Sequence, residues 1–124
     1  EYKDGILDTK SNLIAAANGE RMEWKELYTG FAETAEDEGF SDIAASFLDI
    51  ASVEFFYERR YRKLVKNIVE GKVFNRKADV KWHCTNCGYI HKGTGPPEEC
   101  PVCRKSRAYY ELLAENYQVR YIRQ

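Results

Sequence analysis

The chain has 124 residues, of which 44% are apolar and 14% aromatic, so it is long enough for one domain with a small appendage and too apolar to be disordered throughout. Charged side chains make up 31% of it, and no apolar run approaches the roughly 20 residues that a bilayer-spanning helix needs. The first residues also lack the basic start and the apolar stretch of a signal peptide. We therefore expect a chain with no membrane segment.

The net charge is −1, but the charges are unevenly placed along the chain. Residues 1–60 carry 14 acidic and 6 basic side chains, whereas residues 61–124 carry 6 acidic and 13 basic ones. None of the basic runs exceeds three residues, which argues against nucleic-acid binding by the second half. The opposite charges favour docking of the two segments on each other, or head to tail on a second copy.

Two long helices are predicted for the first part of the chain. Apolar residues spaced three and four apart follow Thr9 or Ser11, either of which could cap a helix, and Gly39 can supply the left-handed residue that ends it. Ser41 is expected to cap a second helix, which ends at Gly71. So short a connection forces the two helices into an antiparallel hairpin.

The second part has a different pattern, in which short apolar segments alternate with Gly, Pro and Cys. This pattern predicts small strands joined by turns. We place the boundary at about residues 72–79 and expect two domains, residues 1–75 and residues 76–124. The predicted strands are Val80–His83, Tyr89–His91 and Tyr109–Leu113.

All four cysteines lie in two Cys-x2-Cys turns separated by twelve residues: Cys84, Cys87, Cys100 and Cys103. Each turn aims two thiolates at one point, so two facing turns form a tetrahedral cage suited to zinc or iron. A disulfide scaffold would scatter its cysteines through the chain. The tight pairs instead predict a metal site in a reducing compartment, and we expect a cytoplasmic protein.

The spacing alone leaves the metal open between an inert structural zinc and a redox-active iron. Cys-x2-Cys-Gly-Tyr followed by Cys-Pro-x-Cys, near Trp82, Tyr89, Tyr109 and Tyr110, resembles rubredoxin, whose single iron carries one electron. The resemblance implies iron at the four cysteines, with zinc as a substitute. Arg104 departs from it, because free-standing rubredoxins usually have Gly in this place.

Three glutamates interrupt the apolar stripes of the two helices: Glu20, Glu23 and Glu54. A buried carboxylate is costly unless it is paired or bound to metal. The antiparallel hairpin places all three at about the same depth, which is the arrangement that di-iron carboxylate bundles need. The alternative is that these glutamates pair with arginines near the helix interface: Arg21, Arg59 and Arg60.

Segments of both parts resemble rubrerythrin. They include GERMEW at residues 19–24, AEDEGF at 35–40, IASVE at 50–54, ERRYRKL at 58–64, GKVF at 71–74, WHCTNCGY at 82–89 and LLAENY at 112–117. The resemblance covers roughly residues 5–117, but only the C-terminal portion of the family, without its first helix pair. It implies a mainly α fold with a small β part: an antiparallel helix hairpin, half of a ferritin-like four-helix bundle, followed by a rubredoxin-like domain.

Carried over position by position, the resemblance implies that Glu20, Glu23 and Glu54 ligate iron and that Tyr28 hydrogen-bonds to a ligand carboxylate. The family pattern Glu-x-x-His is broken here, because Tyr57 stands three residues after Glu54. A phenol must lose its proton before it binds metal, and phenolate favours ferric iron. Tyr57 as a ligand, a site with one iron or none, and a degenerate site with Tyr57 as a core aromatic all stay open.

The resemblance implies reduction of hydrogen peroxide at a carboxylate-bridged di-iron site, with electrons relayed from the four-cysteine iron. Two helices cannot enclose such a site, so we expect peroxidase activity only when a second copy, as in a head-to-tail dimer, or a separate chain with the first helix pair completes the bundle. The expected electron donor is a reductase or a rubredoxin-type carrier. The alternatives are a protein that only transfers electrons, with a metal-free helical site, and a zinc-stabilised interaction scaffold. Residues 118–124 suggest no role.

Overall fold

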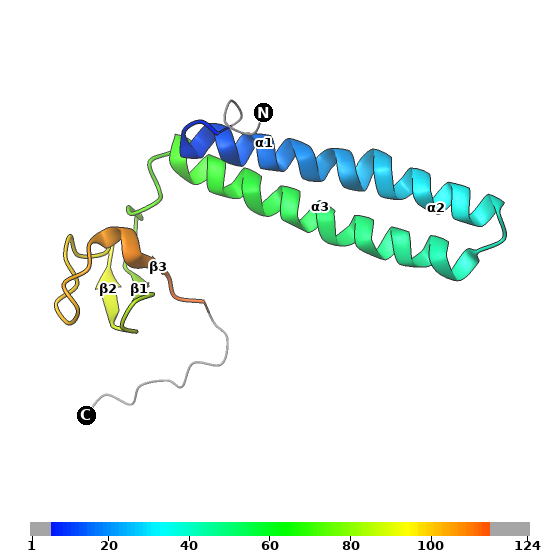
Figure 1. The fold of residues 1–124 in the computed structure, drawn as a ribbon. Coiled ribbons are helices and arrows are strands. Elements are labelled where there is room, and N and C mark those ends of the chain that lie inside the picture. The colour runs from blue at the N-terminus through cyan, green and yellow to red at the C-terminus, as the bar shows by residue number, and fades with distance from the viewer. Residues whose placement is uncertain (1–5, 115–124) are drawn as a thin grey trace. The chain divides into compact units, whose positions relative to one another are not determined.

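The structure, a computed structural model, describes residues 6–114, so residues 118–124 lie outside its described part. The chain divides into two compact units, Glu1–Glu70 and Gly71–Gln124. The first is a helical hairpin, and the second is built on a small antiparallel sheet (Figure 1). The second unit carries the four cysteines, and we call it the cysteine unit. The predicted fold class, mainly helical with a small β part, is confirmed.

The hairpin consists of two long antiparallel rods. The first rod comprises α1 (Thr9–Met22), the π-helical turn η2 (Glu23–Leu27) and α2 (Tyr28–Asp37), and the second is α3 (Ser41–Val69). Gly39, with a φ of 85°, makes the sharp connection as predicted. The cap of α1 is Asp8, not Thr9 or Ser11, because the Asp8 carboxylate accepts a hydrogen bond from the Ser11 backbone N–H at 2.8 Å.

Small side chains fill the contact between the two rods. The buried residues of this contact are alanines, apart from one glutamate described below: Ala17, Ala32, Ala35, Ala44 and Ala51. Larger members of the predicted apolar stripes remain substantially exposed, among them Phe31, which is 47% exposed, and Ile43, Ile50 and Leu64. These larger side chains therefore leave an exposed apolar surface on the hairpin, its open face, outside the inner contact of alanines. Among residues 6–114, no helix is both long and apolar enough to cross a bilayer.

The cysteine unit is built on three short strands, β1 (Val80–Cys84), β2 (Ile90–Gly93) and β3 (Tyr110–Leu112), in the order β2-β1-β3. Both pairings are antiparallel, and Cys84 lies directly opposite Tyr110. Trp82, Cys84, Cys100 and Tyr110 form the buried core. A core this small leaves the sulfur atoms as a main part of the interior.

Candidate metal centres

Two tight turns present the cysteines. In the first turn the Gly88 N–H donates to the Cys84 carbonyl at 2.8 Å, and in the second the Arg104 N–H donates to the Cys100 carbonyl at 3.0 Å. Both donor residues have left-handed backbones, with φ of 84° for Gly88 and 65° for Arg104. Glycine adopts this conformation freely, whereas an arginine is strained by about 1–3 kcal/mol. The departure at Arg104 therefore preserves the turn at a cost in strain.

The four cysteine sulfurs lie close together. We call them the cysteine cluster: Cys84, Cys87, Cys100 and Cys103. The Cys84 and Cys103 sulfurs are 3.7 Å apart, as are those of Cys87 and Cys100, and all four lie within 4.8 Å of one another. A tetrahedral ion with metal–sulfur distances of about 2.3 Å needs sulfur–sulfur edges of about 3.8 Å. The cluster fits a single tetrahedral metal ion.

The four cysteine thiols shift one another's pKa values. Burial raises the pKa of Cys100, but the backbone N–H of Cys103 and the hydroxyl of Tyr110 lower it, to about 6. The backbone N–H of Tyr89 lowers the pKa of Cys87, but burial and the neighbouring sulfurs raise it, to about 12. Four thiolates this close cannot all be ionised without a cation between them. A divalent or trivalent metal removes this conflict.

The hairpin brings the three predicted glutamates together as a second cluster, the carboxylate cluster. Glu20 comes from α1, Glu23 from η2 and Glu54 from α3, and their nearest oxygens all lie within 4.8 Å of one another. Burial, a hydrogen bond with Glu54 and the charges of Glu54 and Glu23 raise the pKa of Glu20 from 4.5 to about 7. In the described part of the chain, no Lys, Arg or His forms an ion pair with these three. A proton shared by carboxylates occupies the place that a cation could take.

A local irregularity in the first rod begins at this cluster. Glu23 opens the π-helical turn η2, in which the Tyr28 N–H donates to the Glu23 carbonyl five residues earlier. The turn inserts one extra residue, so the helix beyond it is rotated by about 100° relative to a continuous α-helix. The spacing of apolar residues did not reveal this turn. Such π-helical turns occur frequently at functional sites.

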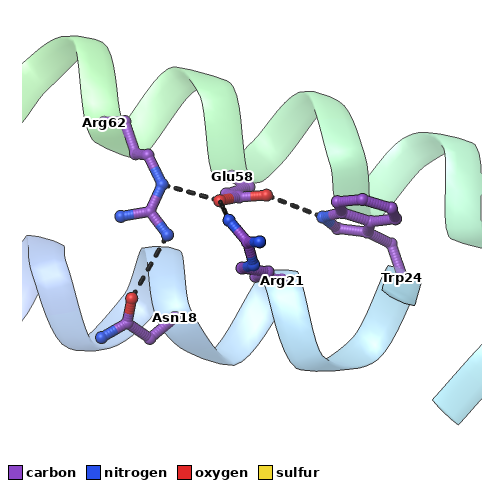
Figure 2. A network of polar contacts seen from close by, with 5 residues as sticks. All are labelled: Asn18, Arg21, Trp24, Glu58 and Arg62. Atoms are coloured by element: carbon purple, nitrogen blue, oxygen red, sulfur yellow. Dashed lines mark hydrogen bonds and ion pairs between the residues drawn. The ribbon is translucent and has the colours of Figure 1, made fainter. Parts of the chain in front are cut away.

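A further acidic side chain, that of Glu58, which the sequence reasoning missed, is buried between the rods (Figure 2). Glu58 is 6% exposed and accepts hydrogen bonds from the Trp24 indole at 2.7 Å and from Nε of Arg62 at 2.6 Å. Arg21 lies 4.0 Å from the same carboxylate, and Arg62 also donates to Asn18 at 3.2 Å. Burial raises the pKa of Glu58, but these donors outweigh it, and the pKa falls below its ordinary value. The Glu58 carboxylate is therefore neutralised by Arg62 and Arg21 and has a structural role.

This arrangement contradicts the alternative in which arginines neutralise the carboxylate cluster. Arg21 pairs with Glu58 instead. Arg59 lies over the ring of Phe55, with its guanidinium carbon 5.7 Å from the ring centre. Within residues 6–114, Arg60 forms no ion pair with a carboxylate. Arg21 and Arg59 are therefore directed to other partners, and none of the three arginines neutralises the carboxylate cluster.

The two tyrosines of interest lie on different parts of the hairpin. The Tyr28 ring packs beside Phe31 and Phe47, with ring centres 6.0 and 6.2 Å away. Tyr57 is 45% exposed on α3. Neither hydroxyl hydrogen-bonds to a carboxylate in the portion of the chain that the structure describes. The roles of Tyr28 as a partner of a ligand and of Tyr57 as a ligand stay predictions.

Comparison with known families gives two matches. The profile of the family described as Rubrerythrin matches residues 1–65, and that described as "Rubrerythrin, rubredoxin-like domain" matches residues 82–111. The first range contains the carboxylate cluster, and the second contains the cysteine cluster.

Individual relatives match over most of this chain but only part of their own length. Rubrerythrin-1 of Clostridium acetobutylicum is 53% identical over 94% of this chain and 60% of that protein. Rubrerythrin of Nitratidesulfovibrio vulgaris is 49% identical over 90% of this chain and 59% of that protein. A solved structure of partially reduced nigerythrin is similar with a TM-score of 0.50 and 30% identity, over 87% of this chain and 51% of that one. The chain thus spans about three fifths of the length of these curated relatives.

Proposed function

This chain belongs to the rubrerythrin family, and on that premise we propose that it reduces hydrogen peroxide at the carboxylate cluster, with electrons supplied through iron in the cysteine cluster. The observation that carries the proposal is the set of three carboxylates within 4.8 Å without an ion pair to a basic side chain in residues 6–114. Iron at the two clusters supplies one-electron transfer at the cysteines and reduction of the peroxide bond at the carboxylates.

The two clusters would have different roles in this reaction. Glu20, Glu23 and Glu54 bind and neutralise cations, and the raised pKa of Glu20 lets that carboxylate keep a proton near neutral pH until metal displaces it. The cysteine cluster receives electrons at its exposed edge, where Cys87 is the exposed member. A reductase or a rubredoxin-type carrier is the proposed donor to that edge.

The carboxylate cluster needs a further protein surface to shield it from water. Di-iron bundles draw ligands from four helices, whereas this hairpin provides two rods and no histidine near its glutamates. Its open face carries exposed apolar side chains such as Phe31, Ile43 and Ile50. We propose that a second copy in a head-to-tail dimer, or a chain with the first helix pair, covers this face, and the opposite charges of the chain's two halves favour such docking.

Metal content and peroxide turnover test the proposal. Anaerobically purified native protein should be red from its cysteine iron and turn over peroxide with a rubredoxin reductase. It should hold two irons per completed bundle plus one per cysteine cluster, which is four for a dimer of this chain and three where a separate chain completes the bundle. Glu54→Ala should keep the red colour and lose the carboxylate iron, with at least about a hundredfold loss of turnover. Equal turnover in the two proteins would remove the carboxylate cluster from the reaction.

The position of Tyr57 allows a second test, in which a substitution should strengthen iron binding. Tyr57→His restores Glu-x-x-His, and neutral imidazole suits ferrous iron better than phenol does. We expect the carboxylate cluster to retain ferrous iron about tenfold more tightly, measured by iron content after dialysis against a chelator. Tyr61→His, one turn further along α3, is the matched control and should leave the retention unchanged. Equal retention in both variants would exclude residue 57 from the metal site.

A second candidate function is electron transfer alone. It is favoured by Tyr57, which replaces the family histidine and is 45% exposed. In this case the carboxylate cluster holds no iron and the cysteine cluster holds the one iron of each chain. A red protein with one iron per chain and no peroxide turnover would support it, whereas a colourless zinc protein would leave only a scaffold.

A further inference from the structure

One buried hydroxyl in the cysteine unit has no evident task in the fold. Tyr110 begins β3 directly opposite Cys84 and is 5% exposed. Its ring packs in the core with Trp82, Cys84 and Cys100. A phenylalanine ring would fill the same space, so the packing does not account for the hydroxyl.

The hydroxyl is also unsatisfied within the protein's own hydrogen bonds. Among the described residues, Oη of Tyr110 is buried and has no hydrogen-bond partner of good geometry. A buried hydroxyl without a partner destabilises the folded state relative to phenylalanine. An acceptor is therefore needed, and the core around Tyr110 offers mainly sulfur.

Cys100 is the acceptor that the chemistry indicates. Two of the four buried residues of this core belong to the cysteine cluster, Cys84 and Cys100, so a cluster sulfur is the acceptor within reach of the unpartnered hydroxyl. The effect of the hydroxyl on Cys100, whose pKa it lowers, agrees with that sulfur. A thiolate accepts hydrogen bonds more strongly than a neutral thiol, and the thiolate is the form that binds metal. The contact should consequently become a true hydrogen bond when Cys100 coordinates an ion.

We propose that Tyr110 is a positioning residue of the cysteine cluster, whose hydroxyl donates a hydrogen bond to the Cys100 thiolate and raises the reduction potential of the bound iron. The direction follows from charge. When the iron takes up one electron from its donor, ferric becomes ferrous and the cluster gains one negative charge, which a hydrogen bond to a ligand sulfur stabilises. The inference rests on the part of the proposed function that assigns iron to the four cysteines.

Tyr110→Phe in the full chain tests this directly, because it removes only the hydroxyl. At a fixed potential we expect the ratio of reduced to oxidised iron to fall several-fold, up to about tenfold, which for one electron corresponds to about 59 mV. The sulfur-to-iron charge-transfer bands should move to longer wavelength, since the sulfur becomes more electron-rich. Both are read from one redox titration followed by visible absorption.

Tyr109→Phe is the matched control. Tyr109 is the preceding residue, is 41% exposed, and its ring contacts the Lys105 ammonium at 5.4 Å, away from the buried core. The control should leave both the potential and the bands unchanged. An unchanged potential in Tyr110→Phe, or equal shifts in the two variants, would overturn the proposal.

A measurement on the unmutated protein guards against a variant that fails to fold. In the cadmium-loaded protein, NMR should find the Tyr110 hydroxyl proton protected from solvent exchange and coupled to the cadmium nucleus through the hydrogen bond. Rapid exchange without coupling would contradict the proposal. A colourless protein that holds no iron would refute the proposed function instead, so the two failures are distinguishable.

Discussion

Glu54 and Glu58 lie four residues apart on the same helix and carry the same side chain, yet the groups that surround their carboxylates differ. Glu58 is surrounded by donors, with the Trp24 indole at 2.7 Å and Arg62 at 2.6 Å. Glu54 instead shares a hydrogen bond with a second carboxylate, that of Glu20. One carboxylate is stabilised by the fold, and the other is the one that we propose as a metal ligand.

The difference shows how a structural carboxylate can be told from a candidate metal ligand. A buried charge that serves stability must bring its own counter-charge, because an unpaired ion in the interior is costly. A carboxylate without such a counter-charge can bind a cation, whereas an arginine paired with it would compete with the ion. The raised pKa of Glu20 and the lowered pKa of Glu58 are the two signatures of this choice.

Removal of the structural carboxylate should have the largest effect. Glu58→Leu leaves the Trp24 indole and the Arg62 guanidinium without their acceptor between the rods. Because Arg62 and Arg21 are themselves about half-exposed and can turn to water, we expect a loss of about 1–3 kcal/mol in the free energy of unfolding. Urea denaturation followed by helical circular dichroism measures it, and an unchanged midpoint would contradict the structural role.

The equivalent change at Glu54 should act in the opposite direction on the metal-free protein. Glu54→Gln removes a negative charge beside Glu20 and Glu23, so near pH 8 the hairpin should gain up to about 1 kcal/mol. The same variant should lose iron at the carboxylate cluster and keep that of the cysteine cluster. A destabilisation as large as that of Glu58→Leu would show that the two glutamates do not differ.

The pH dependence of stability offers the subtlest test. The pKa of Glu20 rises from 4.5 to about 7 on folding, so the metal-free hairpin should lose stability as the pH rises from about 4.5 to 7. The pKa of Glu58 is lowered, so its contribution is present above its unfolded pKa and is lost as the pH falls below it. Glu54→Gln should flatten the loss between pH 4.5 and 7, whereas Glu58→Leu should not. Equal pH profiles in the two variants would refute this assignment.

Much of this architecture could be read from residue patterns, for local reasons. The turn at Gly39 follows from a residue that tolerates a left-handed backbone, and the strands around Cys84 follow from short apolar runs between turns. The pair Glu58 and Arg62 was also within reach, as a four-residue helical spacing. Its partner Trp24, from the other rod, was not, because no local pattern encodes a contact across 34 residues.

By itself, the sequence determined what depends on neighbours along the chain: two cysteine turns, two rods, and three glutamates at matching depths. Tertiary structure alone decided that alanines form the contact between the rods, that a π-helical turn begins at Glu23, and that the nearby arginine Arg21 pairs with Glu58 and not with the carboxylate cluster. The reason is that a spacing rule states which side chains share a face of a helix. Which face meets a partner, and which charge finds a counter-charge, depends on where the second rod lies.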